Sequence, residues 1–186
     1  MNNTPLLNTP LQWSEALSLE MPLMDITHQE FVELLAHTVT SPDDTLLSRW
    51  ATLIDHTQEH FDREDQWMLD TGFAAGNCHS GQHLVILEVM REGGKRGLTG
   101  DLGVVRQMAH ELGLWFPQHA QSMDASLALH LRSAGYDPVT GVISQPQALP
   151  ATQIHGCGGA SCGDTAQASA DDLELQDNIA TAAAPL

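Results

Sequence analysis

The sequence predicts an all-α protein: an up-down-up-down four-helix bundle, preceded by an N-terminal arm and followed by a disordered C-terminal tail. Apolar residues recur at three- and four-residue intervals in four stretches, as they do on one face of an amphipathic helix. Short segments rich in glycine, proline and capping residues separate these stretches, and no segment shows a persuasive strand-like alternation. Helices joined by such short connections pack antiparallel to their neighbours.

The first 40 residues divide into the arm and the first helix. Residues 1–25 contain three prolines and scattered apolar side chains without a regular period, so they are expected to pack along the bundle as an arm. From about residue 26 to 40, Phe31, Leu35 and Val39 recur at helical spacing. This pattern predicts the first helix.

Capping and glycine signals set the limits of the other three helices. The sequence SPDD at 41–44 predicts an N-cap at Ser41, with a proline and two acids in the first turn. The second helix is expected to run to about residue 70, where TGFAAGN interrupts the pattern. The third is expected to end at GGKRGLTGD, residues 93–101, and the fourth at Gly135 and Pro138.

The domain organisation follows from chain length and from a change in composition. A chain of 186 residues is long enough for one buried core, so residues 26–136 are expected to form a single domain. Residues 137–186 hold six acids, no lysine or arginine and few large apolar residues, which is typical of a disordered tail. This tail is where an unidentified protein partner would bind, if there is one.

The three cysteines are too few for a disulfide framework. Cys157 and Cys162 lie five residues apart in the glycine-rich tail, where they could form a disulfide on oxidation or hold a soft metal ion. The alternative is an inert tail. Cys78 is expected to be an ordinary small thiol.

The charge and hydropathy of the chain exclude several classes of partner. Seven basic residues against 24 acids leave a net charge of −17, which argues against binding to nucleic acid or to an anionic membrane surface. The N-terminus has no basic start, and no apolar run reaches the roughly 18 residues of a membrane span. A cytoplasmic protein that binds small ligands or cations is therefore expected.

Each predicted helix carries residues of metal-ligand type on its inward face. They are His28 on the first helix, His60 and Glu64 on the second, His79 and His83 on the third, and His119 and Asp124 on the fourth. A single inward histidine is more often a hydrogen-bonded core residue, and an isolated HxxxE or HxxxH pair is often a solvated one. Five imidazoles and two carboxylates in one small interior, however, would be too costly to desolvate without a counter-charge. Together the seven residues predict a metal site.

Four segments of the chain from about 13 to 135 resemble a bacterial hemerythrin domain. In order they are DITH at 25–28, HFDRE at 60–64, HSGQH at 79–83 and WFPQHAQSMD at 115–124. The resemblance implies a non-haem di-iron centre bridged by an oxo or hydroxo group. It implies that His79, His83 and His119 bind one iron, that His28 and His60 bind the other, and that Glu64 and Asp124 bridge the two.

By the same resemblance, dioxygen would bind reversibly at an open position on the iron with two histidines, for storage, delivery or sensing rather than catalysis. The expected apolar lining of this position is Trp115, Phe116, Phe31 and Phe61, which would keep out water and reductants. Phe116 departs from the leucine more usual in the family, and its larger ring is expected to narrow the pocket.

Other functions of a di-iron site remain open at the level of sequence. A peroxide- or nitric-oxide-reducing enzyme, or a redox sensor, needs only an open ferrous position. Ferritin-like oxidases use Glu-x-x-His pairs, and this sequence contains none. An iron or zinc carrier would have to release its metal readily, which seven ligands from four helices disfavour.

Overall fold

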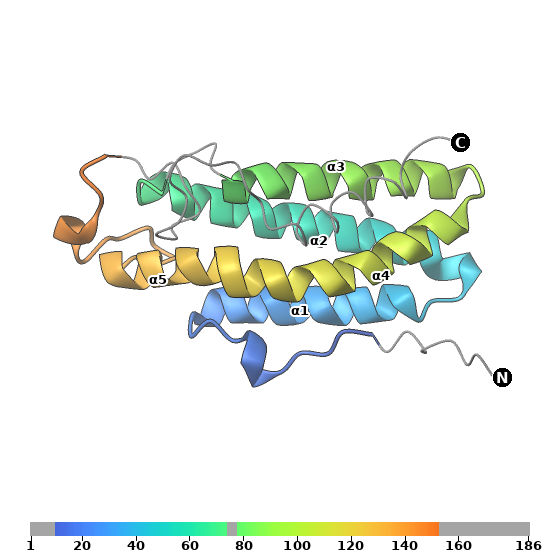
Figure 1. Ribbon diagram of the computed structural model, residues 1–186, viewed down its shortest axis with the longest axis horizontal. Helices are drawn as coiled ribbons and strands as arrows, with labels where there is room; N and C mark the ends of the chain where they lie inside the picture. The colour runs from blue at the N-terminus through green and yellow to red at the C-terminus, as the bar shows by residue number, and fades with distance from the viewer. Residues whose placement is uncertain (1–9, 74–77, 153–186) are drawn as a thin grey trace.

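The computed structural model describes residues 10–73 and 78–152, which are helical for most of their length. The helices are α1 (Pro22–Val39), α2 (Asp43–Asp70), α3 (Cys78–Leu98), α4 (Leu102–His119) and α5 (Ala125–Ala134). A π-helical turn, Ala120–Asp124, joins α4 to α5, so that residues 102–134 run on as one rod (Figure 1).

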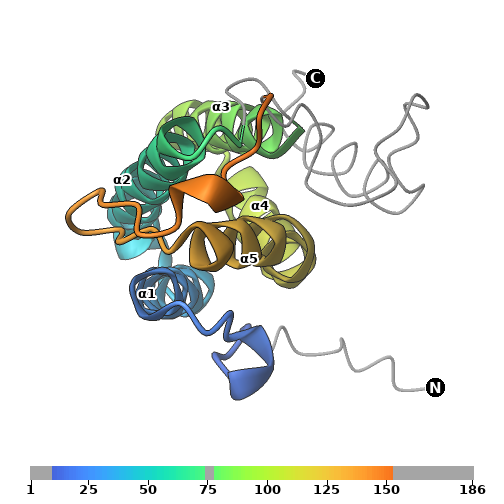
Figure 2. The ribbon, with the colours of Figure 1, turned by 90° about the vertical axis from the view of Figure 1, so that its left-hand side faces the viewer.

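Helices α1, α2 and α3 and the α4–α5 rod form the predicted four-helix bundle. Each of α1, α2 and α3 packs against the next helix in the sequence, and α4 closes the bundle against α1. Seen along its axis in Figure 2, the bundle has α1, α2, α3 and the α4–α5 rod around one interior. Within the described ranges the only β pairing is an isolated bridge between Tyr136 and Ile143. The all-α bundle predicted from the periodicity is confirmed. No described helix is both long and apolar enough to cross a membrane.

The interior consists of two apolar clusters with a polar layer between them. The larger cluster includes Phe31, Trp50, Phe61, Met90 and Phe116, and the smaller includes Met24, Trp67, Met68, Phe73 and Leu127. On α1, the buried His28 lies between Met24 of the smaller cluster and Phe31 of the larger one. The polar layer is therefore closed from water at both ends by packed side chains.

Helix α3 ends at Leu98, within the predicted segment 93–101, after continuing through the paired glycines at its start. Within this segment, Gly93 and Gly97 let neighbouring helices approach. A Cβ added at Gly93 would lie 2.1 Å from Met108 Sδ, and one at Gly97 would lie 2.5 Å from a Leu47 methyl group. The chain turns only afterwards, at Gly100, where φ is +105°.

The cap predicted for α2 is also wrong in detail. The N-cap residue of α2 is Pro42, which makes no side-chain cap. Ser41 instead donates a hydrogen bond from its hydroxyl to the carbonyl of His37, 2.6 Å away, and so belongs to the end of the preceding helix.

The segments flanking the bundle are bound to it. In the arm, Leu17 and Met21 are buried, and the Asp25 carboxylate accepts hydrogen bonds from the backbone N–H of Leu19 and the hydroxyl of Ser18. The first part of the predicted tail, residues 137–152, folds back on the end of α5. There the backbone N–H of Gln145 donates to the carbonyl of Ala134, 2.9 Å away. The Cys157 and Cys162 pair lies outside the described residues.

Candidate metal centre

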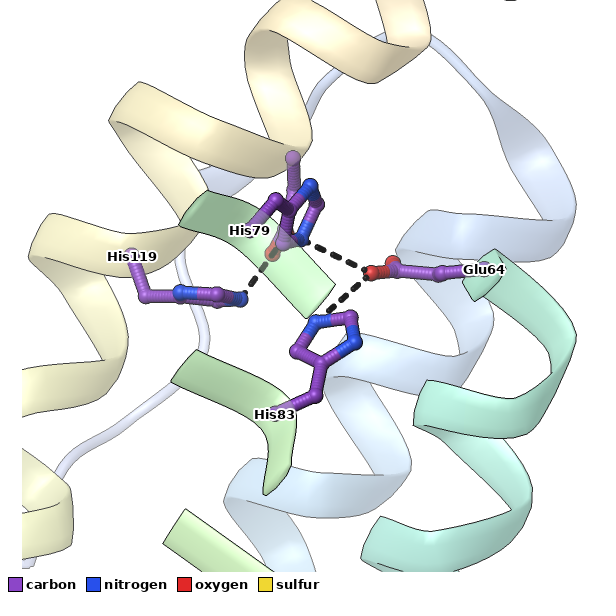
Figure 3. A group of neighbouring side chains, drawn as sticks. Glu64, His79, His83 and His119 are labelled. Carbon is purple, nitrogen blue, oxygen red and sulfur yellow. Dashed lines mark ion pairs between the residues drawn. The ribbon is translucent and has the colours of Figure 1, made fainter. Parts of the chain in front are cut away.

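The structure brings all seven predicted ligand residues into one buried cluster. His28 comes from α1, His60 and Glu64 from α2, His79 and His83 from α3, and His119 and Asp124 from the α4–α5 rod, and all seven are 3% exposed or less. Figure 3 shows His79 and His83 turned toward the Glu64 carboxylate, with His119 facing the same space.

Two different helical geometries aim these side chains inward. On α2 and α3 the pairs are four residues apart, which places both members on one face of an α-helix. His119 and Asp124 are five apart, and in an α-helix of 3.6 residues per turn they would diverge by about 140°. The π-helical turn at Ala120–Asp124 winds less tightly and brings them to the same side, with His119 Nε2 and Asp124 Oδ1 3.1 Å apart. The sequence did not predict this turn, although the five-residue spacing was its signal.

The Glu64 carboxylate lies between two sets of histidines. Its Oε1 is 3.1 Å from His60 Nε2 and 3.8 Å from His28 Nε2. Its Oε2 is 3.3 Å from His79 Nε2 and 3.5 Å from His83 Nε2. We call His28 and His60 the two-histidine set, and His79, His83 and His119 the three-histidine set.

Asp124 divides its oxygens in the same way. Oδ2 lies 3.2 Å from His28 Nε2, whereas Oδ1 lies 2.9 Å from His79 Nε2 and 3.1 Å from His119 Nε2. Each carboxylate therefore offers one oxygen to each histidine set. The three-histidine set with its two oxygens, and the two-histidine set with Glu64, each form a compact group able to hold a metal ion.

The hydrogen bonding of the cluster fits a bound cation. Four of the five Nε2 atoms and three of the four carboxylate oxygens are buried and make no hydrogen bond to the described residues, although some of these N···O pairs are 2.9 to 3.3 Å apart. These atoms converge without being aligned as donor and acceptor. Since each unsatisfied buried polar atom costs about 1–3 kcal/mol, a cation that accepts all their lone pairs would relieve a large penalty.

In the metal-free protein, the carboxylates of Glu64 and Asp124 keep two of the histidines protonated. Burial lowers the pKa of His28 and His79, but the adjacent carboxylates of Asp124 and Glu64, which stabilise the protonated rings, outweigh it and raise these pKa values to about 9 and about 10. For His119, burial prevails and lowers the pKa to about 4. Two protonated imidazoles thus balance two carboxylates, and a metal ion has to displace those protons.

Only two of the four aromatic residues expected to line the oxygen position lie beside the two-histidine set alone. Phe116 lies edge-on to His28, with ring centroids 5.2 Å apart, and packs 4.6 Å from Phe31, so these two rings border the two-histidine set. Trp115 stacks instead on His119 of the three-histidine set. Phe61 lies between the sets, stacked on His83 at 3.9 Å and 5.3 Å from the ring of His60. Phe31 and Phe116 are therefore the rings nearest to a position beside His28.

Two residues that the sequence reasoning missed contact the outer nitrogens of the three-histidine set. His83 Nδ1 lies 2.9 Å from an Asp65 carboxylate oxygen, and His119 Nδ1 lies 3.1 Å from the Gln82 side-chain carbonyl. Asp65 directly follows Glu64 in the sequence and Gln82 directly precedes His83, and this adjacency was the only sequence signal.

The expectation that Cys78 is an ordinary free thiol is wrong, because Cys78 is disulfide-bonded.

The chain is similar to a known protein along most of its length. Bacteriohemerythrin from Ralstonia nicotianae (strain ATCC BAA-1114 / GMI1000) is 34% identical to this chain over 127 residues, which are 68% of this chain and 93% of the relative. No protein-family model matches the chain, and no solved structure matches it.

Proposed function

Since this chain belongs to the bacterial hemerythrin family, we propose that its buried cluster holds two iron ions joined by an oxo or hydroxo bridge, and that the protein binds dioxygen reversibly. The observation that carries this proposal is the division of the Glu64 and Asp124 oxygens between two sets of histidines. A carboxylate placed in this way serves two ions at once, whereas one ion would draw both oxygens to the same side.

The proposed ligands follow the two sets. His79, His83 and His119 would hold one ion and His28 and His60 the other, with Glu64 and Asp124 shared by both. The ion bound by two histidines has one protein ligand fewer, so a position remains there for a small molecule. Bound iron would supply the two electrons that dioxygen takes up and would recover them when dioxygen leaves.

The protein's own part in this function is to exclude water and competing reactants. Phe31 and Phe116 are each 1% exposed and pack against one another beside His28. A small apolar molecule can pass between such rings as they move, whereas a hydrated anion or a bulky reductant is held back. This arrangement supports holding oxygen rather than reducing it. Storage, delivery and sensing share this chemistry, and a cytoplasmic location stays a prediction.

The test is an absorption spectrum of the iron-loaded, anaerobically reduced protein, recorded before oxygen is added, after it is added and after it is removed. Reversible binding predicts a visible band that appears with oxygen and disappears without it, over repeated cycles. Direct, irreversible conversion to the oxidised spectrum would overturn the proposal in favour of the enzyme or redox-sensor alternatives.

Metal affinity is expected to rise steeply with pH. His28 and His79 carry protons at neutral pH because their pKa values are raised to about 9 and about 10, and both protons must leave when a metal binds. Below these values the affinity for each Co²⁺ ion should increase by about tenfold per pH unit, because each ion displaces one proton, and the combined binding constant for both ions should increase by about 100-fold. Calorimetric titrations from pH 6 to 8, in buffers of different ionisation enthalpy, would count the protons. An affinity that does not change over this range would contradict the prediction.

A further inference from the structure

Two contacts hold the imidazole ring of His83 in place. The ring of Phe61 stacks on that of His83 at 3.9 Å with an angle of 5° between the planes, and the Nδ1–H donates to Asp65 Oδ1, 2.9 Å away. An ionised carboxylate only accepts hydrogen bonds. The proton of a neutral His83 ring therefore belongs on Nδ1, which leaves the lone pair on Nε2, the nitrogen that faces Glu64.

His119 is held in the same manner by different residues. Its ring stacks on Trp115 with centroids 4.4 Å apart, and its Nδ1–H donates to Gln82 Oε1 at 3.1 Å. A side-chain carbonyl oxygen also only accepts, so the Nε2 lone pair of His119 is directed toward Asp124.

The other imidazoles lack this support. The Nδ1 atoms of His28, His60 and His79 are buried and make no hydrogen bond with the residues that the structure describes. Two of the three imidazoles in the three-histidine set thus have a fixed ring plane and tautomer, whereas neither imidazole in the two-histidine set has a partner on its outer nitrogen among residues 10–73 and 78–152. The two halves of the centre differ in preorganisation as well as in ligand number.

We propose that Asp65 and Gln82 are positioning residues that orient His83 and His119, so that the three-histidine set takes up the first metal ion and the two-histidine set the second. This inference rests on the proposed two-ion centre. A ligand already in its binding tautomer and orientation loses less entropy when the metal binds, and a carboxylate on its outer nitrogen makes the imidazole a stronger donor. Outer partners of this kind typically change metal affinity by 10- to 100-fold.

The side-chain exposure of Asp65 makes this inference testable. The Asp65 side chain is 39% exposed, so replacing it leaves no buried cavity. Asp65→Ala removes both the acceptor and the charge, whereas Asp65→Asn keeps an acceptor and removes only the charge. Asp62, three residues earlier on α2, is exposed and accepts a hydrogen bond from the side-chain amide of Gln58, so Asp62→Asn is the matched control. Gln82→Leu tests the second contact on another helix.

The experiment is a calorimetric titration of the metal-free protein with Co²⁺ at pH 7.5. For the unaltered protein we expect two ions per chain in two resolved steps. Asp65→Ala and Gln82→Leu should weaken the tighter step by 10- to 100-fold and change the weaker step by less than about threefold. Asp65→Asn should fall between Asp65→Ala and the unaltered protein, and Asp62→Asn should match the latter.

A second readout separates positioning from general stability. Two-bond ¹H–¹⁵N correlation spectra of the zinc-loaded protein should show His83 protonated at Nδ1, with its ¹⁵N shifts altered in Asp65→Ala and not in Asp62→Asn. Two identical steps in the unaltered protein, or equal weakening of both steps by Asp65→Ala, would overturn the order of filling while leaving the two-ion centre intact. Binding of fewer than two ions by the unaltered protein would overturn the centre itself, and this inference with it.

Discussion

Replacing Glu64 with alanine is expected to abolish the loading of two metal ions. Glu64 is the residue common to both compact ligand groups, and each of its oxygens faces a different histidine set. Its loss removes one oxygen ligand from each ion, as well as the negative charge between them. Removing one partner from a buried ion pair costs about 3–5 kcal/mol, and 3 kcal/mol corresponds to roughly two orders of magnitude in affinity. We expect at most one weakly bound ion per chain and no oxygen-dependent band.

The control for this change is Glu59→Ala, five residues earlier on the same helix. Glu59 is exposed, so its removal changes the net charge equally without affecting the cluster. Metal analysis after desalting should give two irons per chain for Glu59→Ala, and circular dichroism should show that both variants remain helical. Retention of two tightly bound irons by Glu64→Ala would show that Glu64 does not bridge the ions.

The helical interior could be predicted from the sequence because helix period and burial are coupled. The ligand-type residues on α2 and α3 come in pairs four residues apart, namely His60 with Glu64 and His79 with His83. Both members of such a pair lie on one helix face, so the apolar stripe also showed that each pair points into the bundle. The same rule fails for His119 and Asp124, whose five-residue spacing falls on one face only after a π-helical turn that the α period does not include.

Two other features depend on contacts between helices, and local sequence does not specify those contacts. Glycines in a helical pattern mark either the end of the helix or a close approach of another helix. At Gly93 and Gly97 the reason is close approach, which is apparent only from Met108 and Leu47 on other helices. Similarly, the sequence alone indicates that Asp65 is a surface acid on α2. Its role depends on α3, which places His83 Nδ1 2.9 Å from Asp65 Oδ1. The identity of the candidate ligands was therefore predictable, while their outer partners were not.

Replacing Phe116 with leucine is expected to speed both oxygen exchange and autoxidation. Phe116 is 1% exposed, and its ring lies edge-on to His28 and against Phe31, beside the set that has fewer protein ligands. Leucine removes the flat ring that borders this position, and so lowers the barrier for oxygen, water and small anions alike. A decrease of about 1.4 kcal/mol would increase each rate tenfold.

Phe73→Leu is the matched control, because it separates access to the site from loosening of the core. Phe73 is equally buried but belongs to the smaller apolar cluster, where its ring lies 5.1 Å from His130 rather than from a candidate ligand. Both substitutions should lower the free energy of unfolding by about 1 kcal/mol, since each swaps one apolar side chain for a smaller one. Stopped-flow oxygen dissociation and the first-order loss of the oxygenated spectrum should respond only to Phe116→Leu. If both variants accelerate alike, general softening of the bundle controls access, whereas unchanged rates in Phe116→Leu would mean that oxygen reaches the site by a route that avoids this ring.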